Sequence, residues 1–246
     1  MEVITSLDNK HIKNLSKLLN KKYRDLEDKF LVYGDHLVEE AYNSNILLEA
    51  IITSDYECNI DIKKTYVTYE VLKKLTNALN PQKIVGVCRK LNNNTIGNKV
   101  ILLEDIQDPG NLGTIIRSSV AFSFDTIILS NNSVDMYNEK VIRASEGMLF
   151  KINIIRKDIK DIINELKADK YTIYGTKVDG GTDVSKVDYP NKIAIVMGNE
   201  GNGISDTILN MCDNYLYIPI NNCESLNVGV ATSIILYEIG KNNEIK

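Results

Sequence analysis

The second half of the chain contains six short apolar runs, and this series constrains the fold more than any other feature. The runs read VILLED, DTIILS, FKINII, YTIYGTKV, KIAIVMG and YLYIPI, with helical patterns between most of them. Runs that are apolar throughout are typical of strands buried on both faces, and strands that alternate with helices are typical of parallel sheets. From about Val100 onward, the sequence therefore predicts an α/β fold with a mainly parallel sheet covered on both faces.

The first ninety residues predict a smaller α/β domain. Strands are expected at 30–34, in LEAIITS and at 83–89, with helices in NKHIKNLSKLLNKKYR, HLVEEAYNS and TYEVLKKLTNA. The stretch KLNNNTIGNK then breaks every periodicity with asparagine and glycine, as linkers do. We therefore expect a first domain over 1–92, a linker over 93–99 and a second domain over 100–246.

Composition excludes several classes of protein. The chain has 246 residues, of which 43% are hydrophobic and 25% charged, as in ordinary globular proteins. Its first residues lack the apolar core of a signal peptide, and no apolar run approaches the ~20 residues of a membrane span, so a cytoplasmic protein is expected. With no C-x-x-C pair and two histidines near the start, we expect neither a zinc site nor a disulfide framework, but four reduced and mostly buried thiols. The cysteines are Cys58, Cys88, Cys212 and Cys223.

The net charge of −4 conceals a basic stretch over 9–24, which contains six cations and no acid. Apolar residues recur in it at helical spacing, so we expect one amphipathic helix with a basic exposed side. For an isolated helix, a merely solvated face is the more common outcome. The alternative is a patch that binds a polyanion, because screening over ~10 Å makes the local field the relevant one. The candidate residues are Lys10, Lys13, Lys17, Lys21 and Arg24.

Ligands of open parallel sheets lie at the carboxyl ends of the strands, where three loops are unusual. The first, LEDIQDPGNLGTIIRSS, turns through 108–110 into a helix that Asn111 could cap and that carries Arg117. The second is MGNEGNGIS. In the third, YIPINNCESLNVGVATSIILYEI, a strand ends at 218–220, and Ser225 and Asn227 lie where the last helix begins.

The glycine loop does not match the known phosphate-binding signatures. Gly198, Gly201 and Gly203 give G-x-x-G-x-G with no lysine after it, unlike a dinucleotide fingerprint or a P-loop. On its own, the loop is better explained by a tight strand-to-helix connection without a ligand.

Taken together, the three loops resemble, in order and spacing, the three motifs of the SpoU (TrmH-like) RNA ribose methyltransferases of the SPOUT superfamily. The resemblance extends from about Val100 to the end, and the first domain resembles the family's substrate-binding module through ITSLDNKHIKNLSKL, KFLVYGDHLVEEA and NPQKIVGVCRKL. Two positions depart from the pattern. Tyr33 stands where members usually have glutamate, and Gly229 where serine is common.

The resemblance implies S-adenosylmethionine as methyl donor, held by exposed main chain, and attack of a ribose 2′-oxygen on its methyl group. The implied cofactor contacts are Thr176, Met197, Gly198, Gly203, Ile218 and Leu226. The implied catalytic residues are Arg117, Asn111, Glu200, Ser225 and Asn227. Arg117 would first grip an RNA phosphate and stabilise the forming alkoxide, and only second serve as the base itself. Asn111, Asn227 and Ser225 would position Arg117 or the ribose, and Glu200 would orient the loop or pair with an arginine. The plainer interpretation makes Asn111 and Ser225 helix caps and Glu200 a solvated turn residue.

The family further implies a deep trefoil knot in the C-terminal region and a homodimer, and the scattered cysteines and histidines give no reason to expect a metal. We expect the last helix in the dimer interface, because its apolar residues exceed one buried stripe. Those residues are Val228, Ile234, Ile235 and Ile239. Large-subunit ribosomal RNA is the preferred substrate, since a separate N-terminal module suits a structured target. A transfer RNA 2′-O-methyltransferase and a catalytically weak RNA-binding or ribosome-assembly factor of the same fold are the alternatives.

Overall fold

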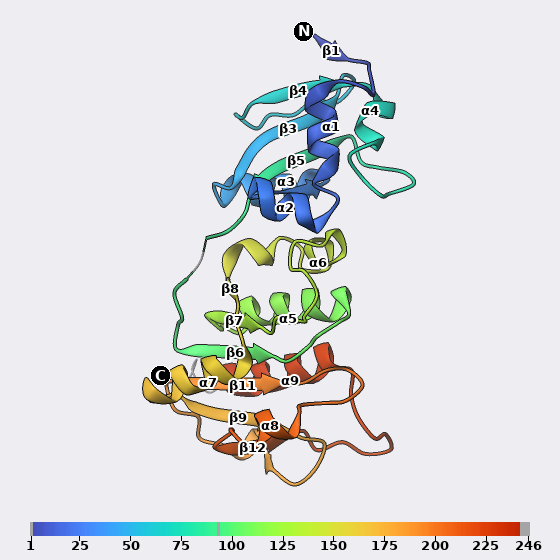
Figure 1. Ribbon diagram of the computed structural model, residues 1–246. Helices are drawn as coiled ribbons and strands as arrows, with labels where there is room; N and C mark the ends of the chain where they lie inside the picture. The colour runs from blue at the N-terminus through green and yellow to red at the C-terminus, as the bar shows by residue number, and fades with distance from the viewer. Residues whose placement is uncertain (1, 93, 242–246) are drawn as a thin grey trace. The chain divides into compact units, whose positions relative to one another are not determined.

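The computed structural model describes residues 2–92 and 94–241, which form two compact units (Figure 1). The first unit comprises Met1–Asn92 together with Tyr137–Phe150, and the second comprises Asn93–Met136 and Lys151–Lys246. The segment Tyr137–Phe150 thus belongs to the first unit although the chain has already entered the second. The division predicted from the sequence, at the linker, does not include this return. Residue 93 of the expected linker and residues 242–246 of the expected second domain lie outside the described residues.

The first unit is built on a five-stranded mixed sheet in the order β1-β4-β3-β5-β2. Its strands are β1 (Val3–Ile4), β2 (Lys29–Tyr33), β3 (Leu47–Thr53), β4 (Lys64–Val67) and β5 (Ile84–Arg89). Strand β5 runs antiparallel to β2 and β3, while β4 runs parallel to β1 and β3. Besides the helices of the basic stretch, the unit contains α3 (Asp35–Asn43), α4 (Tyr69–Lys73), α6 (Glu139–Ala144) and most of the 3₁₀ helix η1 (Met148–Lys151). Strands β2, β3 and β5 were predicted from their apolar runs, whereas β1 and the half-buried β4 were not.

The basic stretch forms two helices, α1 (Lys10–Lys17) and α2 (Lys21–Glu27), so the prediction of a single helix is wrong. Each helix has an asparagine cap. The side chain of Asn9 accepts hydrogen bonds from the first amides of α1, and that of Asn20 accepts one from Lys22 N at 2.9 Å. A cap satisfies amides that have no intrahelical partner, so Asn20 favours a new helix start over continuation.

The second unit contains a seven-stranded sheet in the order β10-β12-β9-β11-β6-β7-β8, in which every strand pairing is parallel. Its strands are β6 (Lys99–Leu103), β7 (Thr126–Leu129), β8 (Asn153–Arg156), β9 (Thr172–Thr176), β10 (Thr182–Asp183), β11 (Ile193–Met197) and β12 (Asn214–Tyr217). The predicted mainly parallel sheet is confirmed. All six predicted strands are present, and the two-residue β10 is an addition.

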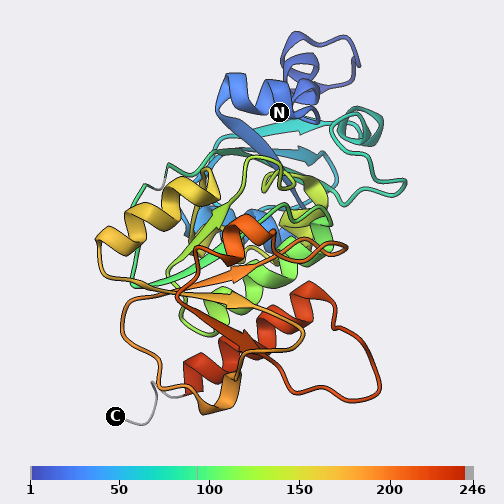
Figure 2. The same ribbon diagram turned by 60° about the horizontal axis from the view of Figure 1, so that its bottom comes forward.

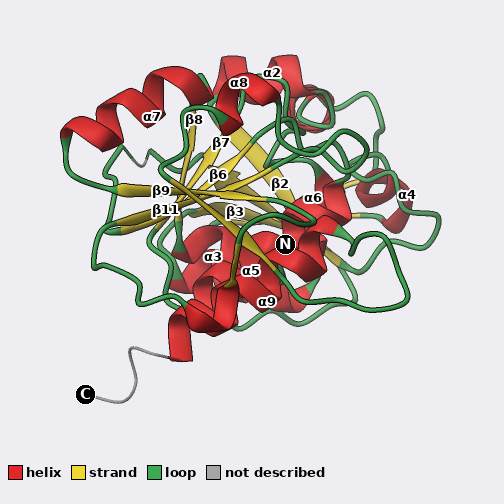
Figure 3. Cartoon of the chain, turned by 90° about the horizontal axis from the view of Figure 1, so that it is seen from below, coloured by secondary structure: helices red, strands yellow, loops and turns green. Residues whose placement is uncertain are grey.

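Helices cover both faces of this sheet (Figure 3). Helices α7 (Ile159–Ala168) and α8 (Asp206–Leu209) lie on one side, where the apolar side of α7 packs on Val100, Leu102 and Val196 in one core cluster. Helices α5 (Pro109–Ala121) and α9 (Val228–Lys241) lie on the other side and pack against each other. A short 3₁₀ helix, η2 (Val184–Lys186), follows β10. This arrangement explains why the central strands are apolar throughout.

Figure 2 shows the last helix, in red, and the long loop that leads into it from β12. A hydrogen bond of 2.6 Å joins Ser118 Oγ of α5 to Ser233 Oγ of α9. Within the described residues, no helix has the length and apolar character that crossing a membrane requires.

Candidate active site

Four neighbouring strands of the second unit, in the order β12-β9-β11-β6, end at one edge of the sheet. Their parallel register aligns Thr176 with Leu216, Gly175 with Val196 and Met197 with Leu103. Because carboxyl ends of parallel strands meet at one edge, the three predicted loops lie there together.

Helix α5 begins at this edge with a cap that differs from the prediction. The Asp108 side chain, not Asn111, is the N-cap, and its Oδ1 accepts from Asn111 N at 2.8 Å. Pro109 follows as the first helical residue, where its missing amide hydrogen costs nothing. The Asn111 side chain is therefore available for contacts outside its own helix.

Glu200, Asn111 and Asn227 form a chain of hydrogen bonds that links all three loops. Asn111 Nδ2 donates to Glu200 Oε1 at 3.0 Å, and Asn227 Nδ2 donates to Asn111 Oδ1 at 2.9 Å. Asn227 Oδ1 in turn accepts from Gly229 N at 2.9 Å and Val230 N at 3.2 Å at the start of α9. Three residues predicted from separate motifs are thus brought into direct contact. Asn227 also caps the start of α9, a role that the plainer interpretation gave to Asn111 and Ser225.

The Glu200 carboxylate is also held by main chain of the first loop. Its two oxygens accept from Asp108 N at 3.1 Å and Gln107 N at 3.3 Å. Partial burial raises the pKa of Glu200, but the hydrogen bonds from Asn111 and these backbone amides outweigh it and hold the pKa below its ordinary value. The side chain is therefore ionised at neutral pH and serves as an acceptor that joins the glycine loop to the start of α5.

The glycine loop closes on itself through Asn199 and Gly203, whose backbone groups exchange hydrogen bonds of 3.0 and 2.9 Å. A Cβ at Gly198 would lie 2.1 Å from the Gly203 carbonyl carbon, so only glycine fits this crossing. Gly203 itself has φ +68°, and a Cβ built there would have no neighbour within 4 Å. The loop therefore combines a tight backbone crossing with exposed main chain at its tip.

Arg117 and Ser225 are not part of the hydrogen-bonded chain. Both are exposed, and neither side chain makes a hydrogen bond or ion pair with any residue that the structure describes. Arg117 lies six residues after Asn111 in α5, a separation of about 9 Å along the axis and about 600° of turn. The two side chains therefore point to different sides of the helix.

The predicted cofactor residues lie along the same edge, with unequal exposure. Thr176 Oγ1 donates to Val196 O at 2.9 Å and ties the end of β9 to β11. Met197 is buried, and its carbonyl accepts from Glu104 N at 3.0 Å. Ile218 and Leu226 are half-buried in the loop between β12 and α9. These positions remain predicted contacts, of which Ile218 and Leu226 have partly accessible side chains.

Two acidic residues that follow β6 support the site and were not predicted. Glu104 accepts from Ser205 N at 2.9 Å and Ser205 Oγ at 2.7 Å, which holds the start of α8. Asp105 O accepts from Asn199 Nδ2 at 2.8 Å. The sequence shows only two acids at the end of a strand. Their contacts with the glycine loop and α8 follow from the pairing of β6 with β11, which the sequence does not indicate.

In the first unit, the basic residues differ in how available they are. Lys13 Nζ lies 2.8 Å from Asp8 Oδ1, Lys21 Nζ lies 2.6 Å from Asp25 Oδ2, and Lys17 Nζ donates to Asn14 Oδ1 at 3.2 Å. The Lys10 side chain is exposed and makes no such contact with the part of the chain that the structure describes. The lysines therefore remain candidates for RNA contact.

Arg24 is a correction to the predicted basic face. The residue is only 8% exposed, and its Nη1 donates to Leu18 O and Leu19 O at 2.9 Å each. Carbonyls at the end of a helix lack intrahelical partners, and Arg24 satisfies those that follow α1. It therefore supports the fold of the first unit and does not present its charge to solvent.

The last helix also differs from the expectation. Val228, Ile235 and Ile239 are already buried within the chain, and Ile234 is half-buried. The apolar side chains that α9 leaves accessible are Val230, 47% exposed, and Tyr237, 52% exposed. The excess of apolar residues is therefore largely explained by packing within one chain.

The four cysteines are free thiols, but only Cys88 is fully buried and Cys223 is exposed. In the described ranges, no group of three or more histidine, cysteine, aspartate or glutamate side chains is placed to hold a metal ion.

The arrangement of fold and loops is that of an RNA methylase domain joined to a substrate-binding domain. The model of the SpoU rRNA methylase family matches residues 98–237, and that of the MRM3-like substrate-binding domain matches residues 9–86. The chain belongs to the SpoU rRNA methylase family.

Similar proteins match over nearly the full length. The 23S rRNA (guanosine(2553)-2′-O)-methyltransferase RlmP of Bacillus subtilis is 33% identical over 97% of this chain and 99% of its own. The AdoMet-bound rRNA methyltransferase from Sinorhizobium meliloti superposes with a TM-score of 0.86 at 27% identity, over 100% of this chain and 99% of its own. A solved RNA 2′-O ribose methyltransferase gives a TM-score of 0.84 at 25% identity, over 99% of this chain and 100% of its own.

Proposed function

We propose that this protein methylates a ribose 2′-hydroxyl of 23S ribosomal RNA with S-adenosylmethionine as donor. The full-length match to a 23S rRNA guanosine 2′-O-methyltransferase, in both domains, is the observation that carries the proposal. The same relative supports the corresponding guanosine as the target nucleotide. Because that substrate belongs to the ribosome, the enzyme would act in the cytoplasm.

The residues at the sheet edge fit this cofactor, which supplies the activated methyl group when bound. Adenosine and methionine moieties carry no phosphate, so the site needs exposed main chain and apolar walls and has no need of a lysine. The glycine loop offers exposed main chain at Gly201 and Gly203, and Ile218 and Leu226 offer partly accessible apolar side chains. Gly198 would keep the loop in the shape that exposes this backbone.

The polar residues would align the ribose and assist loss of its proton. Glu200, with its lowered pKa, is a weak base at neutral pH, so its role is to hold the loops together. Asn111 and Asn227 would then present a fixed amide pair to the ribose, and Ser225 would add a hydroxyl. Arg117 is hardly ever deprotonated, so we assign it first to gripping an RNA phosphate and stabilising the forming alkoxide, whose proton passes to water, and only second to accepting that proton itself.

Two copies of the chain would complete this site. The Arg117 side chain makes no hydrogen bond or ion pair with Glu200, Asn111 or Asn227 of its own protomer, which supports a site where the arginine comes from a second copy. Val230 and Tyr237 of α9 are the accessible apolar groups that such an interface would bury. Light scattering should give twice the monomer mass at micromolar concentration, and a monomer with full activity would contradict the proposal.

We also infer the deep trefoil knot of the family, formed by β12, the following loop and α9. Membership of the family supports the knot, which is a property of that family. Knots are nearly absent from other folds, so strand and helix patterns alone would not suggest one. An experimental backbone trace that straightens when its two ends are drawn apart would exclude it.

Two measurements test the function as a whole. Calorimetric titration with S-adenosylmethionine should release or absorb heat, whereas a ribosome-assembly factor that had lost its cofactor would give none. Ribose methylation should be mapped across total RNA with and without this protein. Without the protein, one guanosine of 23S rRNA should lose its methyl group. A loss in transfer RNA would favour the alternative substrate, and an unchanged map would refute the proposal.

A further inference from the structure

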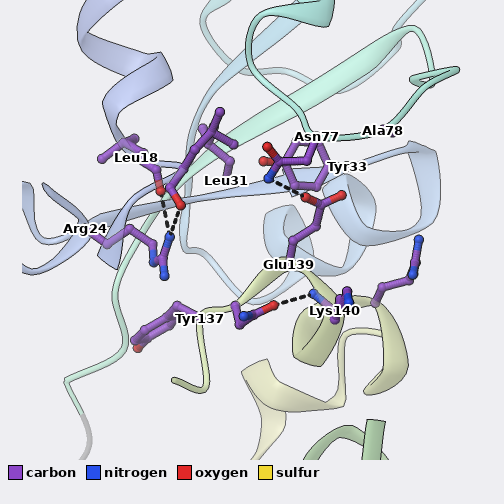
Figure 4. A pocket seen from close by; sticks show the side chains of 12 residues that line it. Leu18, Arg24, Leu31, Tyr33, Asn77, Ala78, Tyr137, Glu139 and Lys140 are labelled. Atoms are coloured by element: carbon purple, nitrogen blue, oxygen red, sulfur yellow. Dashed lines mark hydrogen bonds between the residues drawn. The ribbon is translucent and has the colours of Figure 1, made fainter. Parts of the chain in front are cut away.

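The first unit contains a cavity of about 400 Å³ that has no residue in common with the methyl-transfer site (Figure 4). One side is formed by the turn after α1, by β2 and by the segment after α4, and the other by the segment that begins at Tyr137. Cavities of roughly 300 to 1,000 Å³ hold small organic ligands, so the volume suits a group as large as a nucleotide.

The floor of the cavity is apolar and fixed in place. Leu18 and Leu31 are buried, and the Tyr137 ring packs on Phe30 at a centroid distance of 4.6 Å. The Arg24 guanidinium anchors the turn after α1, and Tyr33 OH donates to Leu75 O at 3.1 Å. Burial and the charge of Glu139 raise the pKa of Tyr33, so this wall stays neutral at physiological pH. A planar apolar group could enter without rearrangement of the floor.

The rim carries charges of both signs. Lys140 and Arg143 of α6 are exposed, and within the described ranges their side chains make no hydrogen bond or ion pair. Glu139 reaches into the cavity from the same helix, where Asn77 Nδ2 donates to its Oε2 at 3.4 Å (Figure 4). The rim therefore offers two cations for an anionic group, and the carboxylate and amide oxygens of Glu139 and Asn77 for a donor.

We propose that this cavity binds one unstacked nucleotide of a single-stranded segment of the RNA substrate, an inference that rests on the proposed function. The base would lie on the floor of Leu18, Leu31 and Tyr137, and its phosphate would meet Lys140 and Arg143. Single-stranded bases are commonly recognised in this way, by stacking together with hydrogen bonds to their edges. Glu139 and Asn77 accept from an amino group, so a base with an exocyclic amine is favoured over uracil, which has none.

Short RNAs test this with the full chain. We would measure fluorescence anisotropy with labelled oligo(A), oligo(C) and oligo(U) of about ten nucleotides, a length that covers one single-strand site. Oligo(A) and oligo(C) should bind about tenfold more tightly than oligo(U), and Glu139→Gln should reduce this preference. Equal affinity for the three RNAs would overturn the proposed base recognition.

Further variants separate the phosphate contact from the base contact. Lys140→Gln with Arg143→Gln should weaken all three RNAs and reduce the salt slope by about 0.7, the contribution of one phosphate contact to a single strand. Ala78→Phe, which fills the cavity without a change of charge, should weaken oligo(A) about tenfold and leave the salt slope unchanged. The matched control replaces Lys73 and Lys160 by glutamine, two exposed lysines outside the cavity, and should bind as the unaltered protein does.

The nucleotide cavity can be refuted without refuting the proposed function. If the cavity variants bind RNA like the unaltered protein while S-adenosylmethionine binding and ribose methylation persist, the nucleotide cavity is refuted and the proposed function stands. If no heat of S-adenosylmethionine binding is observed, the proposed function itself has failed.

Discussion

Two regions hold their polar residues in different ways: the loop edge, where the three loops of the second unit lie together, and the basic helices α1 and α2 of the first unit. At the loop edge, Glu200, Asn111 and Asn227 are partners of one another. In the basic helices, Lys13 and Lys21 are paired instead with the acids Asp8 and Asp25. Residues of family motifs that bind one another can be identified together from the sequence. A run of like charges does not indicate which of its charges are paired with acids in the folded chain.

The largest expected effect concerns Arg117, a motif residue whose side chain has no hydrogen-bond or ion-pair partner among the described residues. Arg117→Ala should lower the methylation rate roughly a hundredfold or more, about 3 kcal/mol, by loss of charge at the alkoxide. Stability should change by no more than about 0.5 kcal/mol, because the side chain is exposed. Arg117→Lys should recover part of the rate, since lysine offers charge without the planar fork.

Single-turnover methylation of the RNA substrate is the measurement, with calorimetric titration of S-adenosylmethionine as control. Cofactor affinity should persist in both variants. If the Arg117→Ala protein methylates RNA at the rate of the unaltered protein, the proposed role of Arg117 is refuted and the residue is only a surface charge.

The backbone crossing at Gly198 gives the next effect. Gly198→Ala places a Cβ 2.1 Å from the Gly203 carbonyl carbon, so the loop must shift, at a cost of about 2 kcal/mol in stability. Cofactor affinity should fall with it. Gly201→Ala is the matched control, because its Cβ would meet only Asn199 Oδ1 at 3.5 Å. Thermal melting and cofactor titration would check both, and equal behaviour of the two variants would contradict the proposed role of the loop.

Glu49 of β3 offers a counterpart to Glu200 within the first unit. Its carboxylate lies 3.1 Å from His11 Nε2 of α1, 3.0 Å from Lys63 Nζ and 2.5 Å from Thr65 Oγ1. Burial raises the pKa of Glu49, but Thr65, Lys63 and His11 outweigh it and lower the pKa below the ordinary 4.5. This cluster fastens the basic helix α1 to the sheet.

The sign of the pH dependence follows from the lowered pKa of Glu49. The ionised cluster stabilises the fold fully above about pH 4.5, and this contribution is lost as the pH falls through the folded-state pKa. Glu49→Gln should therefore cost about 1 to 2 kcal/mol at neutral pH and progressively less in acid. Urea unfolding between pH 3 and 7 would measure it, and a constant difference between the two proteins would contradict the assignment.

The basic helices give the smallest expected effect. Replacing Lys10, Lys13, Lys17 and Lys21 by glutamine should weaken RNA binding and flatten its salt dependence by roughly one unit per lost phosphate contact. Since Lys13 and Lys21 are paired with acids, Lys10 and Lys17 should account for most of the change. Cofactor titration should be unaltered, and an unaltered salt slope would mean that the face is only solvated.

The strands and the site loops could be predicted from sequence because their signals are local. Strands buried on both faces are apolar throughout, so all six of the predicted strands in the second unit are found. The half-buried β4 and the two-residue β10 carry no such signal. Glu200, Asn111 and Asn227 were found together because each belongs to a motif of the family.

What could not be predicted depends on contacts between residues far apart in the chain. The segment Tyr137–Phe150 joins the first unit through Phe30, which packs on both Tyr137 and Phe150. The two-helix form of the basic stretch differs in that its contacts are local: Asn20 caps α2, and Arg24 folds back to Leu18 and Leu19, but the charge pattern indicates neither. Such pairings require the folded backbone before they can be recognised.

The Asn227 side chain connects the loop after β12 to the start of α9, and this affects how that region opens. The first amides of a helix usually exchange their hydrogens with water readily, but Gly229 N and Val230 N are held by Asn227, which is itself held by Asn111. Opening of the loop would release both amides, so loop and first helical turn form one cooperative unit. Hydrogen exchange at Gly229 and Val230 would thus slow whenever a ligand orders the loop, even though neither residue need touch that ligand.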